Sequence, residues 1–434
     1  MNSGSSKNRT KTGLWGLLRI GIRQNRGTRW SFFFLLALVL ISVFSPFLSN
    51  DKPLYAQKDG KAYYPVLREI LVDYGLAKPI AEWRNMKWRT DKKYTGKIFP
   101  PIPYSASELD VRNARFMGPF DKQRVSEDRF WHQLGTDKLG RDVAAGMIAG
   151  VRIALLVGLI SMSIATILGL LLGSLAGYYG DRGLQYRLGH VLGGSLGLVA
   201  GIYYGFVFRG TALVFAANED RWTSAFMGSL LIVFGCMVIG VLFGRFLSII
   251  PGLRRARFFP MDWLVMRGVE IFNAVPGLFL LLAIVAVIDQ PSVYYVMVVI
   301  GLLRWTTIAR FARAEFLKIR ELEYVQAGKI LGFSDFRIIW RHILPNAIGP
   351  ILITIAFGMA SAILVESALS FLGIGLGTGE ISWGLLLREA RTNFGAWWLA
   401  VFPGLAIFAT VLCFNLLGEG LTDALDPKQL ERQN

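Results

Sequence analysis

Stretches of 14 to 28 residues without Asp, Glu, Lys or Arg alternate with charged connections along most of this chain. A helix needs about 20 mainly apolar residues to cross a bilayer. The sixth of the stretches is short, so it crosses only if its helix continues past Arg304 toward Ala309. The pattern predicts an all-α polytopic membrane protein with eight spans, at residues 31–49, 153–180, 188–208, 222–244, 271–288, 290–303, 342–365 and 392–418.

The first stretch follows a basic N-terminal segment, as the apolar part of a signal peptide does. No small-x-small cleavage site follows Phe44, and Pro46 and Phe47 come next. We therefore interpret residues 31–49 as an uncleaved first span.

A polar domain separates the first two spans. It comprises residues 50–134, and the proline cluster at residues 99–103 favours extended chain and turns there. It is either a spacer or a docking surface for an outer partner, and the sequence leaves both open. The expected organisation is an N-terminal segment 1–30, the span 31–49, the outer domain 50–134, a second-span region 135–183, a two-span region 184–261, a region 262–418 and a C-terminal segment 419–434.

Composition agrees with a membrane protein. Hydrophobic residues make up 53% and charged residues 18%, whereas about 25% charge is usual in soluble domains. The net charge of +17 could indicate nucleic-acid binding, but the cations lie on loops between spans. With two cysteines and three unpaired histidines, a disulfide scaffold is excluded and a metal site is not expected.

The charges also predict orientation. Cytoplasmic loops are enriched in Lys and Arg. With a cytoplasmic N-terminus, residues 1–30, 181–187, 245–270, 304–341 and 419–434 are cytoplasmic and hold 24 of the 47 Lys and Arg residues, against four in the short outer loops. Both termini are therefore expected in the cytoplasm.

Glycines recur every fourth residue in two spans. The second span carries Gly169, Gly173 and Gly177, and the third carries a stripe at positions 193, 197, 201 and 205. Small residues on one helix face let two helices approach closely in lipid. We expect tight helix packing at both stripes.

No motif for catalysis is present. The Gly-Lys pairs are followed by Ala or Ile, so no Walker A loop exists, and GxSxG and HExxH are also absent. The chain is expected not to be an enzyme and to bind no cofactor. Five ionisable residues lie at the ends of apolar stretches, where their side chains can reach the interface, which disfavours a proton relay: Arg152, Glu270, Asp289, Arg304 and Glu366.

Residues 310–350 predict a helix–Gly–helix element. Residues 321–331 have helix-forming composition, and Gly332 can end that helix in a left-handed conformation. Ser334 is suited to cap the next helix, and Asp335 lies where the helix dipole favours an anion. The second helix, 336–343, leads to Pro345 at the start of a span, so a rigid element that transmits force into the membrane is expected.

Residues 323–332 (EYVQAGKILG), followed after nine residues by residues 342–346 (HILPN), resemble the EAA signature of ABC-importer permeases. The resemblance is to the C-type subunit of the dipeptide/oligopeptide/nickel permease family. Further matches in the same order occur at 135–142 (GTDKLGRD), 150–152 (GVR), 368–373 (ALSFLG), 382–384 (SWG), 402–404 (FPG), 414–418 (FNLLG) and 423–427 (DALDP). They cover residues 135–183 and 262–428.

Two features depart from the family pattern. The EAA triplet reads Gln326-Ala327-Gly328, and residues 184–261 are an insertion. The family has six spans, so the two inserted spans give eight and preserve the topology of the spans after them. The 50–134 domain resembles the outer loop of microcin C-type oligopeptide permeases at residues 50–54, 59–66 and 100–105.

The resemblance implies a type I ABC-importer transmembrane domain in a bacterial cytoplasmic membrane. It implies a second permease subunit, two ATP-binding subunits and an extracytoplasmic solute-binding protein as partners, and transport of oligopeptides by alternating access. A nickel or other small-solute permease and a stand-alone secondary transporter remain alternatives. The residues that it implies for contact with the ATPase are Tyr324, Val325, Gln326, Ala327, Gly328, Gly332, Ser334, Asp335, His342, Leu344, Pro345 and Asn346.

Overall fold

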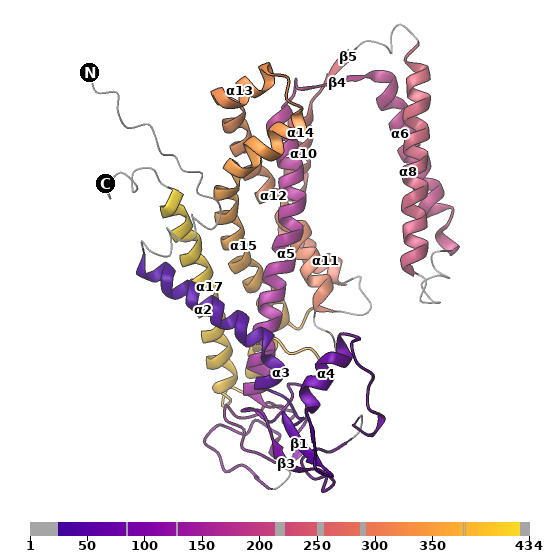
Figure 1. The fold of residues 1–434 in the computed structure, drawn as a ribbon. Helices are drawn as coiled ribbons and strands as arrows, with labels where there is room; N and C mark the ends of the chain where they lie inside the picture. The colour runs from indigo at the N-terminus through magenta and orange to yellow at the C-terminus, as the bar shows by residue number, and fades with distance from the viewer. Residues whose placement is uncertain are drawn as a thin grey trace, which may run out of the picture. The chain divides into compact units, whose positions relative to one another are not determined.

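The computed structural model describes residues 25–425, except residues 84–85, 127–128, 213–221, 250–255, 287–291, 376 and 378. Within these residues, seven helices are long and apolar enough to cross a bilayer, and a bent helix pair adds an eighth span if it is counted as one. The predicted all-α polytopic fold is thus confirmed (Figure 1). Asp289 and most of the N- and C-terminal segments lie outside the described residues.

The chain divides into two compact units, residues 174–268 and the rest. The span-forming helices are α2 (Arg26–Val43), α5 (Val143–Tyr179), α6 (Leu188–Ile202), α8 (Trp222–Leu247), α12 (Val293–Arg320), α15 (Leu344–Leu372) and α17 (Trp398–Leu425). The shorter helices are α3 (Ser45–Leu48), α4 (Pro65–Asp73), α10 (Met261–Ala274), α11 (Gly277–Ala286), α13 (Glu323–Ile330), α14 (Asp335–Ile338) and α16 (Trp383–Thr392).

The remaining elements are short turns and strands. They are the 3₁₀ turns η1 (Ala81–Trp83) and η2 (Val111–Asn113), the π turns η3 (Tyr203–Val207) and η4 (Ile339–Ile343), and the strands β1 (Tyr55–Lys58), β2 (Lys61–Tyr63), β3 (Thr95–Ile98), β4 (Leu184–Arg187) and β5 (Ala256–Phe259). Little sheet is expected, because only a closed barrel would satisfy strand backbones in lipid.

The first span begins earlier than expected and is broken near its end. The Asn25 side chain accepts a hydrogen bond from the Gly27 backbone N–H at 2.9 Å, so α2 starts at Arg26. The helix stops at Val43 and restarts as α3 around Pro46. Proline lacks the N–H that would continue the preceding helix, which accounts for the restart.

The fifth span is not one straight helix. A bend of 76° separates α10 from α11 at Pro276, a residue that disfavours helical backbone in the position before it. The next helix, α12, runs without a break from Val293 through Arg304 to Arg320. The condition set for the sixth span, continuation past Arg304, is therefore met.

The 50–134 domain has its own small core. Strands β2, β1 and β3 form an antiparallel sheet in that order, with Ala56 opposite Tyr63. Trp88 and Tyr94 are buried beneath it and pack with Trp83. The proline cluster is extended, as predicted, and a bridge between Ser49 and Ile102 returns the chain to the end of the first span.

The unit of residues 174–268 is a helical hairpin. Strands β4 and β5 pair antiparallel at its base, with Leu184 opposite Phe259. A Cβ on Gly193 would lie 2.1 Å from the Gly240 carbonyl oxygen, and one on Gly197 would lie 2.3 Å from that of Cys236. The backbones of α6 and α8 therefore touch along the predicted stripe.

The same kind of contact joins α5 to α12. A Cβ on Gly169 would lie 2.7 Å from the Trp305 carbonyl oxygen, and one on Gly173 would lie 2.4 Å from that of Ala309. The close packing predicted for the second span is thus present.

Two ionisable residues lie deeper than expected. Glu366 is 2% exposed within α15, where it accepts hydrogen bonds from Ser370 Oγ at 2.6 Å and Ser367 Oγ at 3.3 Å. Arg304 donates to Ser361 Oγ from the middle of α12. The expectation that both side chains reach the interface is wrong, because α12 and α15 extend beyond the uncharged stretches that defined the spans.

We expect Gly193→Val to separate α6 from α8. Overpacking of this kind costs about 1–3 kcal/mol. In detergent, with Cys413 replaced by serine, N-ethylmaleimide should modify Cys236 several-fold faster, because Cys236 lies at this contact. Gly210→Val is the control, since no atom lies within 4 Å of a Cβ there. An unchanged rate for Gly193→Val would contradict the close packing.

Candidate functional site

The predicted helix–Gly–helix element is α13, Gly332 and α14. Gly332 has φ +76°, and its N–H donates to the Lys329 carbonyl while that of Phe333 donates to Gly328. This pair of bonds is the Schellman motif, which ends α13. Ser334 Oγ accepts from the Arg337 N–H at 3.4 Å and caps α14. The predicted helix end at Gly332 and the predicted helix cap at Ser334 are confirmed.

The inner side of the element is apolar and tightly packed. Val325, Gly328 and Ile338 are buried, and a Cβ on Gly328 would lie 3.4 Å from the Phe333 ring. His342 stacks on the Phe333 ring with centroids 6.0 Å apart. Several of the predicted coupling residues therefore hold the two helices together and face away from solvent.

Hydrogen bonds connect α13 to both neighbouring long helices. Gln326 Nε2 donates to the Arg320 carbonyl at 2.8 Å, at the end of α12. Asn346 Nδ2 donates to the Tyr324 hydroxyl at 3.2 Å and to the His342 carbonyl at 2.6 Å, at the start of α15. Burial raises the pKa of Tyr324 and outweighs its hydrogen bond with Asn346. An amide at position 326 can donate this bond, whereas an ionised acid cannot.

The element continues directly into a span. Residues of α14, the π turn η4 and α15 form one helical run from Asp335 to Leu372. Leu344 and Pro345 lie in its path, and Pro345 occupies the first turn of α15, where its missing N–H is tolerated. Displacement of α14 would therefore act on the span without a flexible link.

Large apolar side chains face solvent on this element. Ile330 is 86% exposed, Leu331 and Phe336 are each 72% exposed, and Trp340 is 58% exposed. We name these four residues the coupling patch. Exposed apolar groups among charged ones are typical of a docking surface. The sequence prediction did not include them, although their large apolar side chains in a charged segment were a usable signal. Ala327 and Asp335 are exposed beside them.

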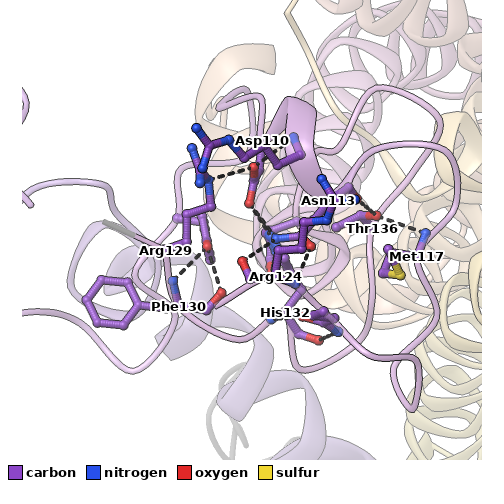
Figure 2. A network of polar contacts seen from close by, with 12 residues as sticks. Asp110, Asn113, Met117, Arg124, Arg129, Phe130, His132 and Thr136 are labelled. Carbon is purple, nitrogen blue, oxygen red and sulfur yellow. Dashed lines mark hydrogen bonds and ion pairs between the residues drawn. The ribbon is translucent and has the colours of Figure 1, made fainter. Parts of the chain in front are cut away.

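A second polar site lies where the 50–134 domain meets α5 (Figure 2). Asp137 accepts hydrogen bonds from the N–H groups of Leu139 and Arg141, which closes the loop of residues 135–142. Asp142 caps α5 through the Ala145 N–H at 2.7 Å, and its other oxygen lies 2.8 Å from His132 Nδ1. The sequence marks residues 135–142 only as a family match, and their structural role was not predicted.

Figure 2 shows this network around the buried His132. Asp110 lies 3.4 Å from His132 Nε2 and pairs with Arg129 at 3.1 Å. Burial alone would raise the pKa of Asp110, but hydrogen bonds from Asn113 and His132 bring it below the ordinary value. Thr136 donates to the Asn113 carbonyl at 2.6 Å.

The loop also contacts α17, and α5 contacts α16 close by. Trp398 Nε1, at the start of α17, donates to the Thr136 carbonyl at 3.1 Å. Trp383 Nε1, at the start of α16, donates to the Met147 carbonyl of α5 at 3.0 Å. The 135–142 loop thus joins the domain to α5 and α17, and α16 is fixed to α5.

Comparison with known proteins places these features in context. Residues 237–431 match the family described as "Binding-protein-dependent transport system inner membrane component". The chain is 28% identical over 415 residues to the inner membrane ABC transporter permease protein YejE of Escherichia coli (strain K12), covering 94% of this chain and 95% of that protein.

Two other relatives are named for peptide transport. A Brucella suis protein, named as a permease of a peptide transport system, is 39% identical over 212 residues, which are 49% of this chain and 71% of that protein. The dipeptide transport system permease protein DppC of Alkalihalophilus pseudofirmus is 29% identical over 333 residues, with 76% and 81% covered.

The lowered pKa of Asp110 predicts that the stability of the 50–134 domain depends on pH. A carboxyl with a lowered pKa stabilises the folded state above its ordinary pKa of 3.8 and loses this contribution as pH falls through the lowered value. Asp110→Asn should therefore make the 50–134 domain more sensitive to proteolysis at pH 6. The difference from the unmodified chain should shrink as pH falls below 3.8 and vanish below the lowered pKa of the folded state.

The measurement is limited proteolysis of the full chain in detergent, with an acid-stable protease and a range of pH values. Asp73→Asn is the control, because Asp73 is exposed on α4. A difference that stays constant down to pH 3 would contradict the role assigned to Asp110.

Proposed function

This chain belongs to the family of inner membrane components of binding-protein-dependent transport systems, and on that premise we propose that it moves peptides into the cytoplasm as one of two permease subunits of an ABC importer. The observation that carries the proposal is the pair of relatives named as peptide and dipeptide transport permeases. Nothing in the family match favours nickel or a stand-alone transporter.

Coupling to ATP hydrolysis is assigned to separate subunits. The sequence holds no Walker A loop, so we propose that an ATP-binding subunit docks on α13 and α14. The coupling patch would fill an apolar groove of that subunit, and Lys329, Arg337 and Arg341 would surround it. A two-state change in the ATPase pair then shifts α14, and the continuous run into α15 transmits the shift to the cavity.

The residues predicted for coupling divide into two groups under this proposal. Val325, Gly328, Gly332 and His342 maintain the shape of the element, as the packing above supports. Tyr324, Ala327, Ser334, Asp335, Pro345 and Asn346 are exposed and are the proposed contacts to the ATPase. Gln326 and Leu344 are half-buried and link the element to α12 and α15.

The remaining partners follow from the family description. A solute-binding protein would deliver peptide on the outer side, and a second permease would complete the pathway. We propose that the 50–134 domain is a docking surface for the binding protein, because it has its own core and is joined through the 135–142 loop to α5 and α17, which a mere spacer does not require.

A change at Gly332 tests the coupling role. A non-glycine residue at φ +76° costs roughly 1–2 kcal/mol, which is about a tenfold change in the equilibrium constant for forming this turn. Gly332→Arg should therefore reduce peptide uptake by about tenfold or more while leaving the amount of protein in the membrane unchanged.

Gly379→Arg provides a matched control. Gly379 has φ +99° and, like Gly332, has no atom within 4 Å of a Cβ placed there. It therefore bears a similar backbone strain outside both the coupling element and the 50–134 domain. Normal uptake by Gly332→Arg, or equal loss in both variants, would reject the coupling assignment.

Membrane orientation is tested with reporter fusions. We propose that both termini and α13 are cytoplasmic, as the distribution of Lys and Arg favours. Alkaline phosphatase fused after residue 120 should be active, and the same enzyme fused after residue 332 should be inactive. Activity after residue 332 and none after residue 120 would show that the proposed orientation is wrong.

A further inference from the structure

One face of α4 is apolar and exposed. Tyr64, Leu67, Leu71 and Tyr74 follow one another at intervals of three and four residues, so they share a face of the helix. Their exposure ranges from 37% at Leu71 to 75% at Tyr74. Pro65, in contrast, is buried. The helix therefore packs on the domain with one side and presents Leu and Tyr side chains on the other.

The end of the helix extends this face. Gly75 has φ +70°, its N–H donates to the Val72 carbonyl at 2.9 Å, and that of Leu76 donates to Leu71 at 2.8 Å. This is again the Schellman motif, which brings the residue after the glycine back toward the last turn. Leu76 is 76% exposed there. We name Tyr64, Leu67, Leu71, Tyr74 and Leu76 the α4 apolar face.

The charged side chains of α4 contact other residues of the 50–134 domain. Arg68 donates to the Lys78 carbonyl at 3.2 Å and lies over the Trp83 ring at 6.0 Å. Glu69 pairs with Lys52. The polar side of α4 is thus committed to contacts with the domain, and the apolar face has no such contact among the hydrogen bonds and ion pairs of the described residues.

The position of α4 relative to the first span indicates which environment surrounds its apolar face. Helix α3, which directly follows the first span, contacts α4. Figure 1 shows α4 beside α3, on the side of the domain that faces the spans, with β1 and β3 farther from them. At the end of the span, Val43 and Phe44 are 64% and 52% exposed, as expected for side chains in lipid. The contact between α3 and α4 therefore brings the α4 helix close to the exposed apolar end of the first span.

We propose that the α4 apolar face lies in the interfacial layer of the lipid bilayer. Tyrosine is enriched at the membrane interface, where its ring is in the apolar layer and its hydroxyl meets water. Leucines on one side and charges on the other are typical of helices that lie in this layer. With α3 and the loop of residues 135–142, α4 gives the domain a third attachment, to lipid, which limits its tilt. The proposal does not depend on which solute is transported.

Collision measurements on spin labels test this placement. Cys236 and Cys413 are first replaced by serine, and single cysteines are introduced as Leu71→Cys, Leu76→Cys and, on the opposite side of the same helix, Asp73→Cys. The labelled full chain, with the subunits that co-purify, is placed in nanodiscs of phosphatidylethanolamine and phosphatidylglycerol. Labels at 71 and 76 should collide with oxygen several-fold more than with a nickel chelate, and the label at 73 should show the reverse.

Two outcomes would overturn the proposal. If the label at Leu71 meets the nickel chelate as often as the label at Asp73, the face is in water. If both reagents are excluded from Leu71 and Leu76, another protein subunit covers the face. Should Leu71→Cys not reach the membrane, Leu67→Cys reports on the same face, because Leu67 is 45% exposed one turn earlier.

Discussion

Between α5 and α12, the backbone of one helix rests on the backbone of the other at Gly169 and Gly173. Lipid tails are as apolar as leucine side chains, so helices in a bilayer gain little from apolar burial and depend on close packing. Each of the two helices leads from this contact to another part of the chain. The N-terminal end of α5 is capped by Asp142 of the 135–142 loop, and the C-terminal end of α12 leads into α13. The glycine contact therefore connects the domain between the first spans to the proposed coupling element.

The chain uses glycine in a second way, at the ends of helices. Gly75 and Gly332 both adopt left-handed backbone and both end a helix with the Schellman pair of hydrogen bonds. An exposed apolar face adjoins each turn, on α4 before Gly75 and at Phe336 and Trp340 after Gly332. Sharp reversals at glycine thus place apolar side chains where a partner or lipid can cover them, on both sides of the membrane part.

Two ionisable groups inside the membrane part have serine hydroxyls as partners. The Glu366 carboxylate has serine hydroxyls as donors, and the Arg304 guanidinium has Ser361. A buried polar group without a partner costs several kcal/mol, so such bonds are expected wherever an ionisable residue lies within a span. Glu366 lies beside α16, whose Gly384 packs against the Ser367 carbonyl, so its bonds hold the end of α15 in a fixed conformation. This structural role explains these residues without a proton relay.

The sequence by itself determined which segments cross the membrane, because twenty apolar residues in succession have few other stable conformations. It also determined the Gly332 turn, the Ser334 cap and both glycine stripes, since each depends on local backbone geometry or on one helix face. The burial of Glu366 and the hydrogen bonds that join His132 to Asp142 and Trp398 to Thr136 were decided only by the tertiary structure. They depend on contacts between residues as far as 262 positions apart, which no local pattern specifies. The exposed apolar residues of α4 and of the coupling patch belong to the same class, because exposure is a property of the packed fold.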